Sequence, residues 1–99
     1  MAKYYLTNKA VQDLNAIWNY TYHRWSEKQA DSYYEMLLEN CQEIAENPNL
    51  GRSYEQILPS LSGHKISKHI IFYRPVGPES IEITRILHES MDLPSRMGE

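Results

Sequence analysis

The side chains best suited to chemistry gather in the second half of the chain, and most of them are cationic. The stretch from His64 to Arg74 carries three cations and no acid. RNA cleavage through a 2′-hydroxyl needs a base, an acid and cations that hold the phosphate, and a histidine can move protons near neutral pH. The candidates for such a reaction are Lys65, Lys68, Arg85 and His88.

Arg85 is the most unusual of these residues because it stands in an aliphatic run. Strict alternation along a strand predicts that Ile81, Ile83, Arg85 and Leu87 share one face, with Glu82, Thr84, Ile86 and His88 on the other. A guanidinium among aliphatic side chains is costly unless it is paired. Two interpretations follow for Arg85. It forms an internal ion pair or aromatic stacking contact, or it contacts an anion or a partner protein.

The sequence carries no recognisable motif for metal or nucleotide chemistry. The histidines at positions 23, 64, 69 and 88 are scattered, and the single cysteine, Cys41, has no neighbouring ligand. The four glycines are isolated, so a glycine-rich phosphate loop is absent from the sequence. We therefore expect no metal and no cofactor, and we expect Cys41 to be a core residue because it continues the apolar pattern around it.

A second candidate surface is acidic. Carboxylates recur every four residues, a spacing that makes them neighbours on a helix surface; they are Glu27, Asp31, Glu35, Glu39 and Glu43. This ridge is either a solvated helix face or a docking surface for a basic partner, with Glu35 and Glu39 at its centre.

The tail after His88 carries apolar side chains, and Arg96 is its only cation. Met91, Leu93 and Met97 are spaced so that they could anchor the tail along a protein surface. The alternative is a frayed terminus.

Length and composition predict one soluble domain spanning residues 1–99. Hydrophobic residues occupy 41% of the positions, more than in chains that stay disordered. The first residues lack the pattern of a secretion signal, and no apolar run approaches the roughly 18 residues that indicate a membrane span. Together with the lone cysteine, these features favour the cytoplasm. A net charge of −3 argues against general or sequence-specific nucleic-acid binding.

Periodicity and capping signals predict the elements that position these residues. The elements are a strand over residues 3–6, helices over 8–24 and 26–47, a connection over 47–60, and strands over 61–67, 69–74 and 80–88. Ser26 and Gln29 have the spacing of a capping box, and Pro48 ends the second helix. The short join makes the helices an antiparallel hairpin. The prediction is an α+β fold, with an N-terminal strand and this hairpin packed on one face of an antiparallel sheet.

Three segments in the same order, AENPNLGRS, HIIFYR and RILHESMD, resemble the ParE toxins of bacterial type II toxin–antitoxin modules, within the RelE/ParE superfamily. The resemblance covers nearly the whole chain. It implies a toxin that inhibits DNA gyrase by binding and is not an enzyme. It also implies a hetero-oligomer with a neutralising, ParD-like antitoxin protein that wraps the toxin.

The RelE-like branch of the superfamily instead cleaves messenger RNA on the ribosome, and this alternative would use His88, Arg85, Lys65 and Lys68. Those nucleases carry an arginine and then a tyrosine after the last strand, whereas Tyr73 is the final tyrosine here. The departure favours the binding toxin, or a silent toxin that keeps only antitoxin binding. The residues expected to contact partners are Lys68, Arg74, Arg85, His88, Met91, Leu93, Met97, Glu35 and Glu39.

Overall fold

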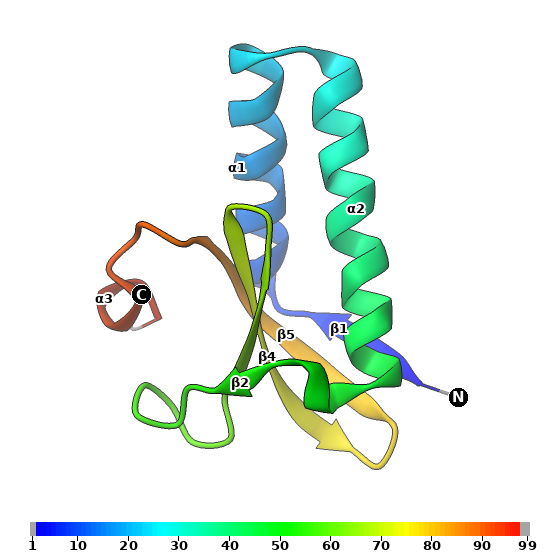
Figure 1. Cartoon of the computed structure of the whole chain (residues 1–99), viewed down its shortest axis with the longest axis vertical. Coiled ribbons are helices and arrows are strands. Elements are labelled where there is room, and N and C mark those ends of the chain that lie inside the picture. Colours follow the sequence, from blue (N-terminus) through cyan, green and yellow to red (C-terminus); the bar gives the residue numbers. More distant parts are fainter. Residues whose placement is uncertain (1, 98–99) are drawn as a thin grey trace.

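The computed structural model describes residues 2–97 and has the expected α+β architecture. A five-stranded sheet has the order β1-β5-β4-β3-β2, and two long helices form a hairpin that rises from it (Figure 1). The strands are β1 (Lys3–Leu6), β2 (Arg52–Ser53), β3 (Ser62–Ile66), β4 (His69–Gly77) and β5 (Ser80–His88). The helices are α1 (Asn8–Arg24), α2 (Glu27–Glu46), the 3₁₀ turn η1 (Pro48–Leu50) and α3 (Leu93–Met97).

Each of the two long helices begins after a side-chain cap, and the cap of α2 is the predicted Ser26. The Thr7 hydroxyl accepts a hydrogen bond from the backbone N–H of Ala10 at 3.0 Å, and the Ser26 hydroxyl accepts one from that of Gln29 at 3.1 Å. Each cap satisfies one N–H group that a helix start leaves unpaired. The helices run antiparallel (Figure 1), as predicted. Within residues 2–97, no helix combines the length and apolar character needed to cross a membrane.

The sheet is mixed, which corrects the prediction of a wholly antiparallel one. β1 pairs with β5 in parallel, in a register that runs from Lys3 opposite Ser80 to Leu6 opposite Ile83. The other pairs, β2–β3, β3–β4 and β4–β5, are antiparallel. A tight hairpin turn forces its two strands to be antiparallel, but β1 and β5 are joined by nearly the whole chain. No local turn therefore fixes their relative direction.

A bulge in β5 overturns the predicted alternation of its side chains. Phe72 lies opposite Arg85 and Tyr73 opposite Ile83, so Thr84 has no place in the regular register. An extra residue in one strand reverses the faces of the residues beyond it. The prediction that Arg85 shares a face with Ile81 and Ile83 is therefore wrong. The other residues beyond the bulge are divided accordingly, since Ile86 packs with Ile81 and Ile83, whereas Leu87 packs in a separate cluster.

α1 binds the backbone groups that the bulge displaces from the ladder. The Thr7 hydroxyl donates to the carbonyl of Thr84 at 2.8 Å, and the Asp13 carboxylate accepts from the N–H of Ile86 at 3.0 Å. Buried backbone groups are expensive to leave unpaired, so α1 stabilises the bulge as well as covering the sheet.

Each face of the sheet has its own hydrophobic cluster. The larger cluster joins the helices to the sheet and includes Leu14, Leu37, Cys41, Ile44, Ile71, Tyr73, Ile81, Ile83 and Ile86. Cys41 is fully buried, as predicted, and burial raises the pKa of its thiol to about 12. The smaller cluster contains Tyr54, Leu61, Ile70, Phe72 and Leu87. Leu93 and Met97 of α3 pack against this second cluster, so the tail contributes to the fold.

The Tyr73 side chain fastens the connection after α2 to the sheet. Its hydroxyl donates to the carbonyl of Pro48 at 2.6 Å and accepts from the N–H of Gly51 at 2.9 Å. A Cβ atom at Gly51 would lie 2.5 Å from that hydroxyl and 2.8 Å from the carbonyl oxygen of Gly63. Only glycine fits this close approach. The connection is thus held at a defined place, although its sequence predicted no regular structure.

Candidate partner-binding site

Arg85 is held in an internal ion pair, which is one of the two alternatives that its sequence context left open. Its Nε and Nη2 atoms donate to the two carboxylate oxygens of Asp13 at 2.8 and 3.0 Å. Its Nη1 atom donates to the carbonyl of Arg96 at 2.6 Å. Only 7% of Arg85 is exposed. The guanidinium therefore joins α1, β5 and α3, and it presents little surface to another molecule.

The sequence analysis missed Asp13. It directly precedes Leu14 of the apolar stripe that buries α1 against the sheet. The sequence did contain a signal for this ion pair. Asp13 is an acid at the border of an apolar stripe, and Arg85 is an arginine in an apolar strand that needs a partner. Pairing the two residues needed the tertiary structure, because 72 residues separate them.

Two histidines on neighbouring strands form the centre of a second polar cluster. His69 lies directly opposite His88, with ring centroids 5.2 Å apart and the rings nearly perpendicular. The Tyr33 hydroxyl of α2 makes a hydrogen bond of 2.7 Å with Nδ1 of His69. Burial, reinforced by the neighbouring His88, lowers the pKa of His69 to about 4, although Asp13 and Glu89 favour its charged form. His69 is therefore neutral at physiological pH.

His88 is held by the turn that follows it. Its Nδ1 atom accepts a hydrogen bond from the backbone N–H of Ser90 at 3.1 Å, and the Ser90 hydroxyl lies 2.8 Å from the same atom. A ring nitrogen that accepts from a backbone N–H carries no proton, so the proton of a neutral His88 sits on Nε2. This arrangement fixes the ring at the border between the two hollows described next.

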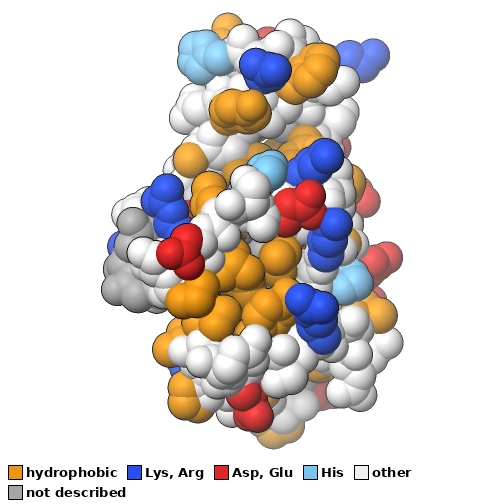
Figure 2. All heavy atoms as spheres, turned by 60° about the vertical axis from the view of Figure 1, so that its left-hand side comes forward, with side chains coloured by type: hydrophobic (Ala, Val, Ile, Leu, Met, Phe, Trp, Pro, Cys, Tyr) orange, Lys and Arg blue, Asp and Glu red, His pale blue; other side chains and the backbone are white. Residues whose placement is uncertain are grey.

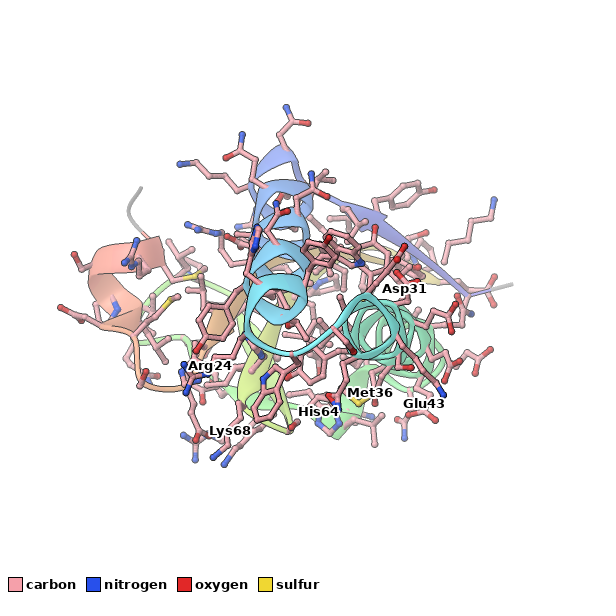
Figure 3. All side chains as sticks on the ribbon, turned by 90° about the horizontal axis from the view of Figure 1, so that it is seen from above. Arg24, Asp31, Met36, Glu43, His64 and Lys68 are labelled. Carbon is pink, nitrogen blue, oxygen red and sulfur yellow. The ribbon has the colours of Figure 1, made fainter. Side chains whose placement is uncertain are left out.

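A groove of about 910 Å³ lies between the end of the helix hairpin and the β3–β4 turn. Helix residues line one side, and residues of the sheet line the other. The first group is Tyr20, Thr21, Arg24, Trp25, Lys28, Gln29, Ser32, Tyr33 and Met36, and the second is Lys68, His69, His88 and Glu89. We call this space the hairpin groove. Arg24 and Lys68 lie on the same side of the molecule, and Asp31 lies on the opposite side (Figure 3).

The hairpin groove continues into a second hollow of about 590 Å³ along α1 and the end of β5. Tyr20, His69 and His88 line both spaces, and Met91 lines the second. The continuous surface therefore reaches from the end of the helix hairpin to the start of the tail. Figure 2 shows hydrophobic side chains gathered on one face, with lysine and arginine side chains along their border.

The structure brings some of the predicted partner-contacting residues together and separates others. Lys68 and His88 share the hairpin groove, and the second hollow places Met91 beside His88. Arg74 lies toward the far end of β4 and forms an ion pair of 3.5 Å with Glu82. Glu35 and Glu39 are exposed on α2 and are not among the residues that line the groove.

The set proposed for RNA cleavage does not converge. Arg85 is occupied by Asp13, and Lys65 forms an ion pair of 2.7 Å with Glu89. Only Lys68 and His88 of the four line a common space. The groove residues contributed by the helices, Arg24, Lys28 and Tyr33 among them, were not predicted as site residues, because no local pattern relates them to the sheet.

Comparisons with known proteins agree with one another. The family model described as "ParE toxin of type II toxin-antitoxin system, parDE" matches residues 4–93. The chain is 35% identical over 92 residues to Toxin ParE1 of Mycobacterium tuberculosis, covering 93% of this chain and 94% of that protein. It is 36% identical over 98 residues to Toxin ParE1 of Caulobacter vibrioides, covering 99% and 100%. The solved structure "Chromosomal ParDE TA system from P. aeruginosa" has a TM-score of 0.74 at 21% identity, covering 89% of this chain and 95% of that one.

Proposed function

This chain belongs to the ParE toxin family of type II toxin–antitoxin systems, and from this membership we propose that it inhibits DNA gyrase in the cytoplasm by binding it. In this proposal a ParD-like antitoxin neutralises the toxin in a hetero-oligomeric complex. The chain itself breaks no bond in its target. Its effect depends on the surface that it presents.

The observation that carries the binding mechanism is the pairing of Arg85 with Asp13. Stabilising the charge of a cleaving phosphate needs cations aimed at an open site. Arg85 instead directs its guanidinium at a carboxylate of its own fold, at 2.8 and 3.0 Å. An anion would have to displace Asp13 from a largely buried position, and breaking a buried ion pair is costly. Arg85 acts as a structural residue in this proposal.

The proton chemistry of the site supports the same conclusion. A general base works best when its pKa lies near the operating pH, but burial lowers that of His69 to about 4. Nδ1 of His88 is occupied by the following turn. The tail also lacks the tyrosine expected of a ribosome-dependent nuclease. These features favour binding over catalysis.

The alternative function is a RelE-like, ribosome-dependent endoribonuclease. One observation favours it, namely that Lys68 and His88 line the same groove. A lysine could hold a phosphate there while Nε2 of His88 exchanged a proton. This pair is the part of the proposed catalytic set that the fold keeps together.

Two assays on the purified toxin separate these functions. We expect inhibition of gyrase-catalysed DNA supercoiling, and we expect no cleavage of messenger RNA when the toxin is added to programmed ribosomes. The co-encoded antitoxin should reverse the gyrase inhibition at stoichiometric amounts. Ribosome-dependent cleavage at catalytic turnover, without an effect on gyrase, would replace the proposal with the alternative. A His88→Gln variant should keep its gyrase inhibition, whereas it should lose cleavage if the alternative holds.

A further inference from the structure

The hairpin groove contains cations that the fold leaves without carboxylate partners. Arg24, Lys28 and Lys68 line it, and none of them forms an ion pair with another of residues 2–97. The one acid of the lining is Glu89, whose carboxylate forms a hydrogen-bonded ion pair with Lys65 at 2.7 Å. That hydrogen bond holds the pKa of Glu89 below its usual value, with a smaller contribution from Lys68. A chain of net charge −3 thus concentrates unpaired positive charge at one place.

Apolar side chains lie among these cations. Tyr20 and Trp25 are 65% and 67% exposed, although large aromatic residues are rarely left so open. Tyr33 and Met36 complete the apolar lining on the α2 side. Exposed aromatic residues that surround a concavity and are bordered by charges are typical of protein interaction sites. The surface therefore suits a segment that buries apolar side chains and carries acids beside them.

The cations come from three separate elements, since Lys28 lies in the first turn of α2. Arg24 ends α1, and Lys68 belongs to the tight β3–β4 turn. The preceding Ser67 has a backbone angle φ of 56°, a left-handed conformation that is unusual for serine and shows how tightly this turn is folded. A carboxylate at the groove can thus be approached by cations from the helix hairpin and from the sheet.

We propose that the hairpin groove binds a segment of the antitoxin in which acidic residues flank an apolar anchor. The acids would pair with Arg24, Lys28 and Lys68, and the anchor would pack on Tyr20 and Trp25. This inference rests on the toxin–antitoxin function proposed above and deepens it. Charge complementarity argues for an acidic segment. The continuous path from the hairpin groove to Met91 argues for an extended peptide segment and not for a small ligand.

Charge reversal on the full-length toxin tests the groove. The Arg24→Glu/Lys68→Glu double variant should bind the co-encoded antitoxin at least about tenfold more weakly than the wild type. Lys9→Glu is the matched control, because Lys9 is an exposed cation of α1 outside the groove, and its affinity should change less than about twofold. Raising the salt concentration should weaken wild-type binding more than that of an Arg24→Gln/Lys68→Gln variant. Unchanged thermal unfolding would show that each variant is folded.

The apolar part of the groove is tested separately. Trp25→Ala should weaken antitoxin binding about tenfold or more, as expected for a central aromatic anchor. Val11→Ala is its control, since Val11 is an exposed apolar residue of α1 that does not line the groove.

A charge swap tests the pairing directly. An antitoxin whose acidic residues are replaced by lysines should bind the Arg24→Glu/Lys68→Glu toxin better than it binds the wild type.

The outcomes distinguish this inference from the proposed function. Failure of the wild-type toxin to bind the antitoxin would overturn the function itself. Equal binding of wild type and charge-reversed toxin would overturn the inference and leave the function standing. Loss of gyrase inhibition with intact antitoxin binding would assign the hairpin groove to the target, which also overturns the inference.

Discussion

Two cationic regions of this domain contain similar residues but have opposite surroundings. At Arg85 the guanidinium is 7% exposed and is paired with Asp13 and with the carbonyl of Arg96. At the hairpin groove, Arg24 and Lys68 have no carboxylate partner among residues 2–97. The first region serves the fold and the second is open to a partner. A cation is therefore informative about function only when its partners inside the fold are known.

This comparison predicts the largest loss of stability when Asp13, the carboxylate partner of Arg85, is removed. Asp13→Ala should lower the free energy of unfolding by about 3–5 kcal/mol, because it removes the carboxylate that neutralises a buried guanidinium and the acceptor of the Ile86 N–H. Denaturant unfolding measures this change. Lys9→Ala, on the same helix, is the control. A loss below about 1 kcal/mol would mean that Arg85 is solvated in solution, and the two regions would no longer differ.

The comparison extends to a neutral polar group, the Tyr73 hydroxyl, which makes its hydrogen bonds inside the fold. Tyr73→Phe should cost about 1–3 kcal/mol, since the Pro48 carbonyl and the Gly51 N–H lose their shared partner. Tyr5→Phe, at a side chain that is 54% exposed, should change stability by less than about 0.5 kcal/mol. Equal effects in denaturant unfolding would show that the connection after α2 does not depend on this contact.

Acid should destabilise the domain through His69. Its pKa is about 4 in the folded chain, against 6.5 for an ordinary histidine, so the unfolded chain binds more protons between these values. Stability contributed by the neutral ring is complete above about pH 6.5 and declines as the pH falls toward 4. We expect about 1–2 kcal/mol less stability at pH 5 than at pH 7 from this residue. The difference should shrink in His69→Phe, and an unchanged pH dependence would contradict the assignment.

The smallest effect on stability is expected at the hairpin groove. Arg24→Gln and Lys68→Gln should each change the free energy of unfolding by less than about 0.5 kcal/mol, because neither cation has a carboxylate partner within the described part of the chain. Thermal unfolding of the single variants measures this. A loss comparable to that of Asp13→Ala would show that these cations stabilise the fold, and the distinction between the two regions would disappear.

Local patterns in the sequence were sufficient for most elements of the fold. The cap at Ser26, the end of α2 before Pro48 and the burial of Cys41 were all predicted and found. The strand alternation failed at Thr84, because a bulge there reverses the faces beyond it. A bulge depends on contacts with α1, which no short stretch of sequence contains.

The candidate site was predicted only in part. The sequence drew attention to Lys68 and His88, which share the groove, and to Arg85, which does not line it. Arg24 and Trp25 were missed, although they contribute a cation and a largely exposed aromatic side chain to the groove. Each stands at the end of a helix, where a cation or an aromatic residue needs no special explanation. Only the position of the β3–β4 turn beside that helix end makes them part of a site.

The sequence by itself determined the kind of elements, their order and the family, because capping, periodicity and contiguous motifs are properties of neighbouring residues. The tertiary structure decided the parallel pairing of β1 with β5, the partner of Arg85 and which cations lack a carboxylate partner among residues 2–97. The physical reason is distance along the chain. Asp13 and Arg85 are 72 residues apart, and whether a charge is neutralised inside the fold or left for a partner depends on such long-range contacts.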